Sequence, residues 1–392
     1  MTYLLMRCDD VVCRFAMWHD LGCMDEPRRF VASFKELLPA STFALPVNME
    51  PTNKGLTAWL SERTIPRNRA YVQSFLARMG LHEADKVGLL SISHGLSLND
   101  VFWIWSEEQG QPPRFDDINL YDNDFSDQVS LMAFTGQGSF DKGIQAVSSP
   151  EFTTGGMLAK AWRRIDGRIC LYKTGTEGAV NTGYEPYSEY LAAQVARQMG
   201  LRHVAYDLTM WEGKLCSVCE LFTSKDTAFV SAGSLVRRGG MKAVLEYYQD
   251  LGEEYYEQLV SMLAFDAVVA NQDRHFGNFG LLVNAENRIC NTAPLFDHGM
   301  CLLPMAYGED WDSIDLYLKE RPPATYDSYI DFIMPYLGEA QQEQLERLTG
   351  FSFKRHEEHN LPEWRYEKLE RFIAEQAKKL LDTPYSRPPD HL

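Results

Sequence analysis

The chain has 392 residues, of which 38 are basic and 55 acidic, and its formal net charge is −17. Such a charge disfavours proteins that grip nucleic acid phosphates or dock on anionic membranes. No run reaches the roughly 18 apolar residues of a membrane span, and no basic segment followed by a long apolar one opens the chain. We therefore expect a cytoplasmic protein that binds neither nucleic acid nor membrane directly.

The first part of the chain predicts a mixed region that ends in a loop. Residues 3–7 and 11–17 are expected to form a hairpin, and residues 68–80 a helix that stops at Gly80. Glycine, serine and proline are dense from residue 136 to 150, which is typical of a linker or surface loop. We place a boundary there and predict an N-terminal region, residues 1–145, whose role the sequence leaves open.

The order of elements becomes informative after residue 150. The pattern predicts strands at 157–165 and 168–174, a helix at 188–199, and strands at 203–211 and 215–222. Helices follow at 241–249, 254–270, 325–336, 339–348 and 363–381. The fold class expected for residues 146–392 is α+β, with a small β-rich lobe over about 146–224 and a larger, mostly helical lobe over about 225–392.

The strongest chemical signal is the segment 271–282, Asn-Gln-Asp-Arg-His-Phe-Gly-Asn-Phe-Gly-Leu-Leu. Asp273 follows a long helix at the mouth of a polar loop, where a carboxylate can face a substrate hydroxyl. Asn278 opens a short apolar strand, and Asp297 follows a second apolar run, 293–296. If the two runs pair as a hairpin, Asn278 and Asp297 come together as oxygen ligands for Mg²⁺. A positioned metal and a positioned hydroxyl are what phosphoryl transfer requires, so the segment predicts a phosphate-transfer site.

This set, Asp-x-His-x-x-Asn followed by Asp-x-Gly, resembles the HipA family of bacterial serine/threonine kinases. It is also similar to the phosphoinositide lipid kinases, although residues 265–271 and 278–280 favour HipA. The resemblance implies a bilobal protein-kinase-like fold with ATP and Mg²⁺ as cofactors. The resemblance further implies that Asp273 is the catalytic carboxylate and that Asn278 and Asp297 bind the metal. It implies that His275 orients the loop or contacts the transferred phosphate. Arg274 departs from the family, which often has a second Asp there.

The resemblance also implies a set of nucleotide-binding residues upstream. The segment 153–157 is expected to cover the phosphates, and the strand residue Lys173 to contact them. A glutamate at the start of the next helix is expected to pair with Lys173, and the segment 220–222 to receive adenine as a hinge. The residues predicted to bind the cofactor are Thr154, Gly155, Gly156, Lys173, Glu189, Glu220 and Phe222.

Loop hydroxyls near the nucleotide are a separate feature, because such groups can be autophosphorylated in this family. The candidates are Ser148, Ser149, Thr153 and Thr154. The alternative, ordinary loop hydroxyls, stays open for each of them.

Three functions stay open at this point. The first is a serine/threonine protein kinase that phosphorylates a protein hydroxyl and also itself. The second is a kinase of a small molecule or lipid, and the third a pseudokinase that acts as an interaction module. A HipA-type kinase can act with a small DNA-binding antitoxin, and any DNA contact of this acidic chain would need that partner.

Overall fold

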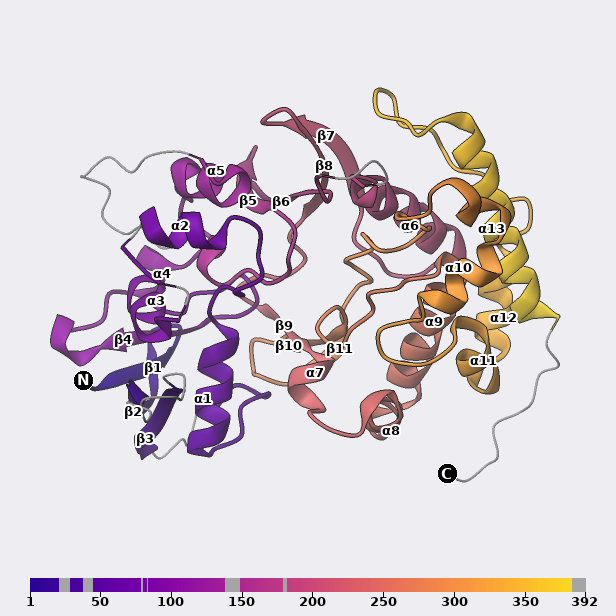
Figure 1. Cartoon of the computed structure of the whole chain (residues 1–392). Coiled ribbons are helices and arrows are strands. Elements are labelled where there is room, and N and C mark those ends of the chain that lie inside the picture. Colours follow the sequence, from indigo (N-terminus) through magenta and orange to yellow (C-terminus); the bar gives the residue numbers. More distant parts are fainter. Residues whose placement is uncertain are drawn as a thin grey trace. The chain divides into compact units, whose positions relative to one another are not determined.

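The computed structural model describes residues 1–20, 29–37, 45–78, 80–82, 84–137, 149–178 and 182–382 (Figure 1). The chain forms two compact units. The first unit is Met1–Tyr172 with Thr223–Val230 and Leu282–Cys290, and the second is Lys173–Phe222 with Ser231–Leu281 and Asn291–Leu392. The boundary predicted at residues 145/146 lies outside the described residues, and it stays a prediction together with the lobe limits.

A four-stranded antiparallel sheet lies in the first unit. Its order is β3-β2-β1-β4, with β1 at Tyr3–Arg7, β2 at Asp10–Asp20, β3 at Arg29–Leu37 and β4 at Phe102–Ser106. The predicted hairpin of residues 3–7 and 11–17 is confirmed as β1 and β2. Helix α1, Asn53–Glu62, packs on β3 (Figure 1). Phe15, Trp59 and Leu60 are buried between this helix and the sheet.

Short helices complete the first unit. They are α2 (Val72–Arg78), α3 (Lys86–Ser93), α4 (Phe115–Ile118) and α5 (Asp127–Thr135), with 3-10 turns η1 (Glu107–Gln109) and η2 (Pro150–Phe152). Residues 68–71 are not helical, contrary to the predicted helix at 68–80. The reason is that Tyr71 has a φ of 60°, outside the right-handed helical region. Phe75 of α2 and Phe152 of η2 then pack in a second apolar cluster.

Two pairs of strands lie on either side of α6 in the sequence. Strands β5 (Lys160–Ile165) and β6 (Arg168–Thr174) are neighbours and flank the turn at Asp166-Gly167, as predicted. Strands β7 (Tyr206–Trp211) and β8 (Lys214–Glu220) pair antiparallel in the second unit. A three-stranded sheet has the order β11-β10-β9, from β9 (Thr227–Ser231), β10 (Gly280–Asn284) and β11 (Ile289–Thr292).

Helices make up most of the second unit. They are α6 (Glu185–Met199), α7 (Ala232–Leu235), α8 (Gly240–Leu251), α9 (Glu253–Val269), α10 (Ile314–Glu320), α11 (Tyr329–Ile333), α12 (Glu339–Glu346) and α13 (Glu363–Leu381), with 3-10 turns η3 (Gly308–Asp312) and η4 (Met334–Tyr336). Of the helix predicted at 325–336, only Tyr329–Ile333 is α-helical, and a 3-10 turn follows it. Ser328 is the N-cap of α11, so this helix begins only at Tyr329. Pro335, near the start of η4, cannot continue an α-helix.

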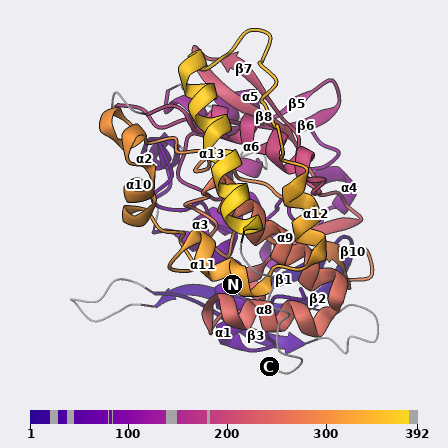
Figure 2. The same ribbon diagram turned by 90° about the vertical axis from the view of Figure 1, so that its right-hand side faces the viewer.

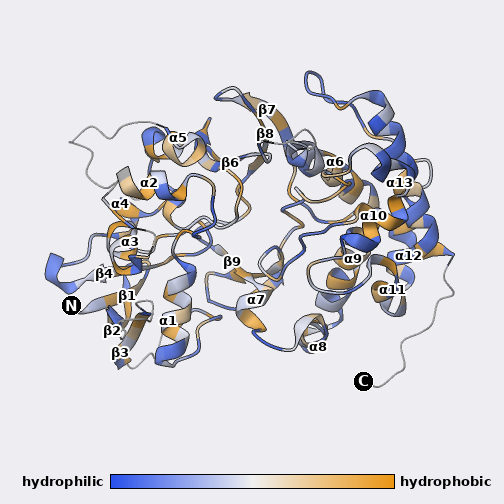
Figure 3. Ribbon diagram, in the orientation of Figure 1, coloured by the Kyte–Doolittle hydropathy of each residue, from blue (hydrophilic) through white to orange (hydrophobic). Residues whose placement is uncertain are grey.

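Helix α9 is the centre of the second unit. Every residue from Leu259 to Val269 is buried, because α6, α8, α11, α12 and α13 all pack against it. Figure 2 shows α9, α12 and α13 side by side. In Figure 3 α13 carries many hydrophilic residues, as expected for an outer helix with one apolar face. The buried end of α9 leads directly to Asn271.

No helix in the described ranges combines the length and the apolar character that crossing a bilayer requires.

Candidate active site

The loop that begins at Asn271 is held by a carboxylate inside α9. Asp266 is fully buried, and its Oδ1 accepts a hydrogen bond of 2.9 Å from the side-chain amide of Asn271. The Asn271 Oδ1 in turn accepts the backbone N–H of Asp273 at 3.1 Å. Ala270, between helix and loop, has a φ of 50° and ends the helix. The position of Asp273 is therefore determined by the buried end of the helix.

Arg274 joins the two segments that carry the predicted metal ligands. Its side chain and that of Asp266 are both fully buried, with Nε and Oδ2 2.8 Å apart and Nη2 and Oδ1 3.0 Å apart. Its Nη1 donates to the carbonyl oxygens of Asn278 and Phe296, both at 2.8 Å. Because Phe296 precedes Asp297, one guanidinium nitrogen holds the backbones next to both predicted ligands close together.

Asp273 and Asn278 lie on the same short loop. The Asn278 Nδ2 donates to the Asp273 carbonyl oxygen at 3.0 Å, which leaves the amide oxygen for other partners. Burial raises the pKa of the Asp273 carboxyl, His275 opposes the rise, and Asp297 adds to it. His275 is exposed, and its Nδ1 accepts the Gly277 N–H at 3.0 Å, so its ring braces the loop.

A lysine and two carboxylates form the charged centre of the site. Lys173, at the end of β6, has its Nζ 2.7 Å from Glu189 Oε1 of α6, the pairing that the sequence predicted. The same Nζ forms an ion pair with Asp297. Burial opposes the charge of Lys173, but Asp297 and Glu189 outweigh it and raise the pKa of the ammonium. Lys173 therefore stays charged between two carboxylates.

Backbone bonds orient Asp297. Its φ is 57°, in the left-handed region, and its N–H donates to the Tyr206 hydroxyl at 3.0 Å. The next N–H, of His298, donates to Glu189 Oε2 at 2.7 Å. Left-handed backbone at a non-glycine residue costs free energy and is held in place by surrounding contacts, as at many functional sites.

The hairpin that precedes Asp297 differs from the prediction. Strand β11 is Ile289–Thr292, and the run 293–296 follows it. The Ala293 N–H still donates to Gly280 O at 2.8 Å, but Leu295 leaves the hairpin and forms a parallel bridge with His203. The expected pairing therefore extends only to Ala293 and not along the whole run 293–296, although Arg274 brings the two segments together as predicted.

The predicted nucleotide residues fall into both units. Lys173 and Glu189 meet in the second unit, where the Phe222 ring also lies 5.3 Å from the Phe296 ring. Glu220 ends β8 and is exposed. Thr154, Gly155 and Gly156 belong to the first unit. Of the candidate phosphorylation sites, Ser148 lies outside the described residues, whereas Ser149 is buried and caps η2.

Two residues with a clear structural task in the site, Asp266 and Asn271, were missed from the sequence, and Arg274 was noted only as a departure. A signal was available. Asp266 stands alone in the apolar helix Leu263–Val269, and a carboxylate inside such a run needs a buried partner. An arginine eight residues later is the natural choice.

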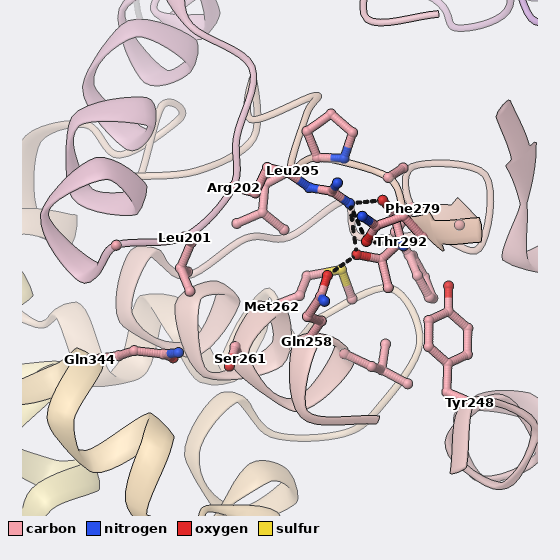
Figure 4. Close-up of a pocket in the computed structure, with 16 residues that line it drawn as sticks. Leu201, Arg202, Tyr248, Gln258, Ser261, Met262, Phe279, Thr292, Leu295 and Gln344 are labelled. Carbon is pink, nitrogen blue, oxygen red and sulfur yellow. Dashed lines mark hydrogen bonds between the residues drawn. The ribbon is translucent and has the colours of Figure 1, made fainter. Parts of the chain in front are cut away.

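A pocket of about 330 Å³ lies elsewhere in the second unit (Figure 4). Its walls include Tyr248, Met262, Phe279 and Leu295, and hydrogen bonds link Arg202 to Thr292 there. Neither Asp273, Asn278 nor Asp297 lines it. The pocket is lined by Phe279 and Leu295, which are close in sequence to Asn278 and Asp297, but it is separate from the candidate active site.

Comparisons with known proteins show which chains this one resembles. Residues 152–345 match the family model of the HipA-like C-terminal domain. The serine/threonine-protein kinase CtkA of Helicobacter pylori is 28% identical over 134 residues, which cover 31% of this chain and 41% of that kinase. The match thus spans less than half the length of this curated relative.

Two solved structures are also similar. The crystal structure of the H. pylori proinflammatory kinase CtkA has a TM-score of 0.47 and 19% identity, covering 59% of this chain and 91% of that one. A chain of the HipA, HipB and operator DNA complex of Shewanella oneidensis MR-1 has a TM-score of 0.50 and 9% identity, covering 97% and 96%. That likeness covers nearly the whole chain, and the expected mixed α+β, kinase-like fold is confirmed. Residues 152–345 belong to the family of HipA-like C-terminal domains.

Proposed function

We propose that this chain is an ATP- and Mg²⁺-dependent phosphotransferase that phosphorylates a serine or threonine hydroxyl of a protein, with itself as a second acceptor. The observation that carries the proposal is Lys173, charged between Glu189 and Asp297. The similarity to a serine/threonine-protein kinase supports a protein hydroxyl as acceptor. We place the reaction in the cytoplasm.

The donors at Asn278 and Asp297 fit a magnesium ion. An amide oxygen and a carboxylate are hard oxygen ligands, and the side chain of Asp297 is 32% exposed. Within the described residues no group of three or more His, Cys, Asp or Glu side chains could hold a metal. Two protein ligands suffice for Mg²⁺ bound together with phosphates, and the ion would neutralise charge on the transferring group.

Each remaining residue then has a task that its position allows. Asp273 accepts a hydrogen bond from the acceptor hydroxyl and takes its proton, which its raised pKa favours. Lys173 offsets phosphate charge, and Glu189 holds its ammonium in place. His275 braces the loop through Gly277.

The test is transfer from γ-labelled ATP by purified variants. Asp273→Asn and Asp297→Asn should each lower the rate by roughly 10²–10⁴-fold, with unchanged circular dichroism. Asp250→Asn, an exposed carboxylate at the end of α8, is the matched control and should keep the wild-type rate. Wild-type rates in both site variants would refute the assignment.

The same assay separates the alternatives. Transfer to metabolites but to no protein would indicate a small-molecule kinase. Absence of any thermal stabilisation by Mg-ATP would indicate a pseudokinase, because a ligand that binds only the folded state must stabilise it.

We further propose a small DNA-binding antitoxin as partner. The Shewanella structure holds HipA with HipB and operator DNA, and a net charge of −17 disfavours direct DNA contact by this chain. The purified chain should therefore not retard a DNA duplex in a gel at physiological salt. Retardation by the chain alone would contradict this proposal.

A further inference from the structure

A buried ion pair in the first unit holds the loop predicted to cover the nucleotide phosphates. Arg69 and Glu151 have side chains only 1% and 0% exposed and form an ion pair. Arg69 lies in the N-terminal region, outside the segment 152–345 that matches the family model. The contact therefore joins residues of unassigned role to the start of the predicted loop.

The guanidinium of Arg69 reaches both ends of this loop. Its Nη1 donates to the carbonyl oxygens of Glu151 at 2.9 Å and Thr154 at 3.4 Å. Its Nη2 donates to the Glu151 carboxylate and to the Lys160 carbonyl oxygen, the latter at 2.8 Å. Residues 151, 154 and 160 thus share one buried group. Only arginine offers such a planar fork of donors.

Neighbouring residues of the N-terminal region add two more ties. The Ala70 N–H donates to the Met157 carbonyl oxygen at 2.8 Å. The Thr153 hydroxyl donates to the Leu96 carbonyl oxygen at 3.0 Å. The loop from 151 to 160 is accordingly attached at its beginning, middle and end to residues 69, 70 and 96.

Contacts inside the loop leave only its tip exposed. Trp162 donates its backbone N–H to Glu151 Oε1 at 2.7 Å and its indole N–H to the Thr154 hydroxyl at 2.9 Å. Lys160 Nζ donates to Gly155 O at 2.8 Å. Gly155 and Gly156 are exposed, and a Cβ at Gly155 would meet nothing within 4 Å. The result is a short open backbone segment on a fixed base.

We propose that Arg69 is a positioning residue for this loop and that the N-terminal region is part of the nucleotide-binding machinery. The proposal rests on the proposed function, because it takes the loop to contact ATP. A loop ordered before binding spends less free energy on ordering when the ligand arrives. Loss of Arg69 would leave Glu151 buried without its cation and free the loop at both ends.

The test compares Arg69→Met with Arg63→Met in the full-length chain. Arg63 is a matched control. It is 6% exposed against 3% for Arg69, pairs with Asp100, and donates to the carbonyl oxygens of Gly95 and Phe102, outside the loop. Amide hydrogen exchange of the protein without ligand and the Kd for Mg-ATP by calorimetry are the two readouts.

We expect Arg69→Met to speed exchange at residues 153–157 and to raise the Kd for Mg-ATP about tenfold or more, with a larger effect on KM than on kcat. Arg63→Met should lower the melting temperature but keep the wild-type Kd. A wild-type Kd in Arg69→Met, or the same rise in both variants, would overturn the proposal.

A second variant covers the case in which Arg69→Met does not fold. Arg69→Lys keeps a charge beside Glu151, but its single nitrogen cannot reach the carboxylate and all three carbonyl groups that the two guanidinium nitrogens of Arg69 contact. This variant too should speed amide hydrogen exchange in the loop and weaken the binding of Mg-ATP. A wild-type Kd for Mg-ATP would again overturn the inference. Failure of the wild-type chain itself to bind Mg-ATP would refute the proposed function instead, and the exchange data alone would then decide whether Arg69 orders the loop.

Discussion

Breaking the Arg274–Asp266 pair is the sharpest test of how the site is built. Both side chains are fully buried. Asp266→Asn leaves the guanidinium without a carboxylate, and Arg274→Met leaves the carboxylate with Asn271 alone. Removing one partner of such a pair costs about 3–5 kcal/mol, which is a large part of the total stability of a typical domain.

The magnitude for the double variant follows from the same contacts. Asp266→Asn with Arg274→Met removes both charges, so no uncompensated ion stays buried. The carbonyl oxygens of Asn278 and Phe296 still lose their donor, which costs about 1–3 kcal/mol each if they stay buried. We expect the double variant to be about 2–3 kcal/mol more stable than the sum of the single costs predicts.

The assay is hydrogen exchange of the α9 amides, because it reports opening of the second unit without interference from the first. Asp250→Asn, exposed on α8, serves as the control and should change the free energy by less than about 0.5 kcal/mol. Single costs that add within about 0.5 kcal/mol would refute the reasoning, since they would mean that the two charges do not compensate each other.

Three further outcomes follow from the described contacts. Lys173→Met should lower phosphate transfer about 100-fold or more and abolish stabilisation by Mg-ATP in a melting assay, because it removes the ammonium that pairs with Asp297 and offsets phosphate charge. An unchanged rate would count against the role of Lys173. Burial raises the pKa of the Cys13 thiol to about 12, so at pH 8 only about one molecule in 10⁴ carries the thiolate at this position. Iodoacetamide should therefore label the exposed Cys290 far faster than Cys13, as measured by mass spectrometry. Equal labelling of both cysteines in the native protein would contradict this prediction. Trp103→Ala should destabilise the first unit by about 3–5 kcal/mol in a urea titration, because the side chain is fully buried and donates to the Cys8 carbonyl oxygen at 2.8 Å. A loss of stability below about 1 kcal/mol would contradict this prediction.

Local signals account for the parts of the fold that were predicted well. The turn Asp166-Gly167 and the stop at Gly200 have the positive φ that their residue types favour, so β5, β6 and the end of α6 were found. The helix predicted at 325–336 is shorter in the structure, because α11 begins only after its cap Ser328 and Pro335 follows its end in a 3-10 turn. The helix at 68–80 was too long because its first residues are held by tertiary contacts of Arg69 that no local pattern reveals.

The candidate site likewise has residues that the sequence could predict and contacts that it could not. Asp273, Asn278 and Asp297 could be chosen from the sequence, because phosphate transfer demands a carboxylate, an amide oxygen and a second carboxylate in a recognisable order. The pairing of Lys173 with Glu189 was expected from the family pattern, and the structure has it at 2.7 Å. The residue types and their order along the chain were thus determined by the sequence alone.

Only the tertiary structure decided what holds those residues in place. Arg274 was noted in the sequence merely as a departure from the family, yet its guanidinium joins the segments of Asn278 and Asp297. No sequence pattern marked Arg69 as a site residue, yet it attaches the N-terminal region to the loop from 151 to 160. Both act through hydrogen bonds to backbone carbonyl groups, which every residue carries, so no sequence pattern marks their acceptors. Burial and distance are needed to find them.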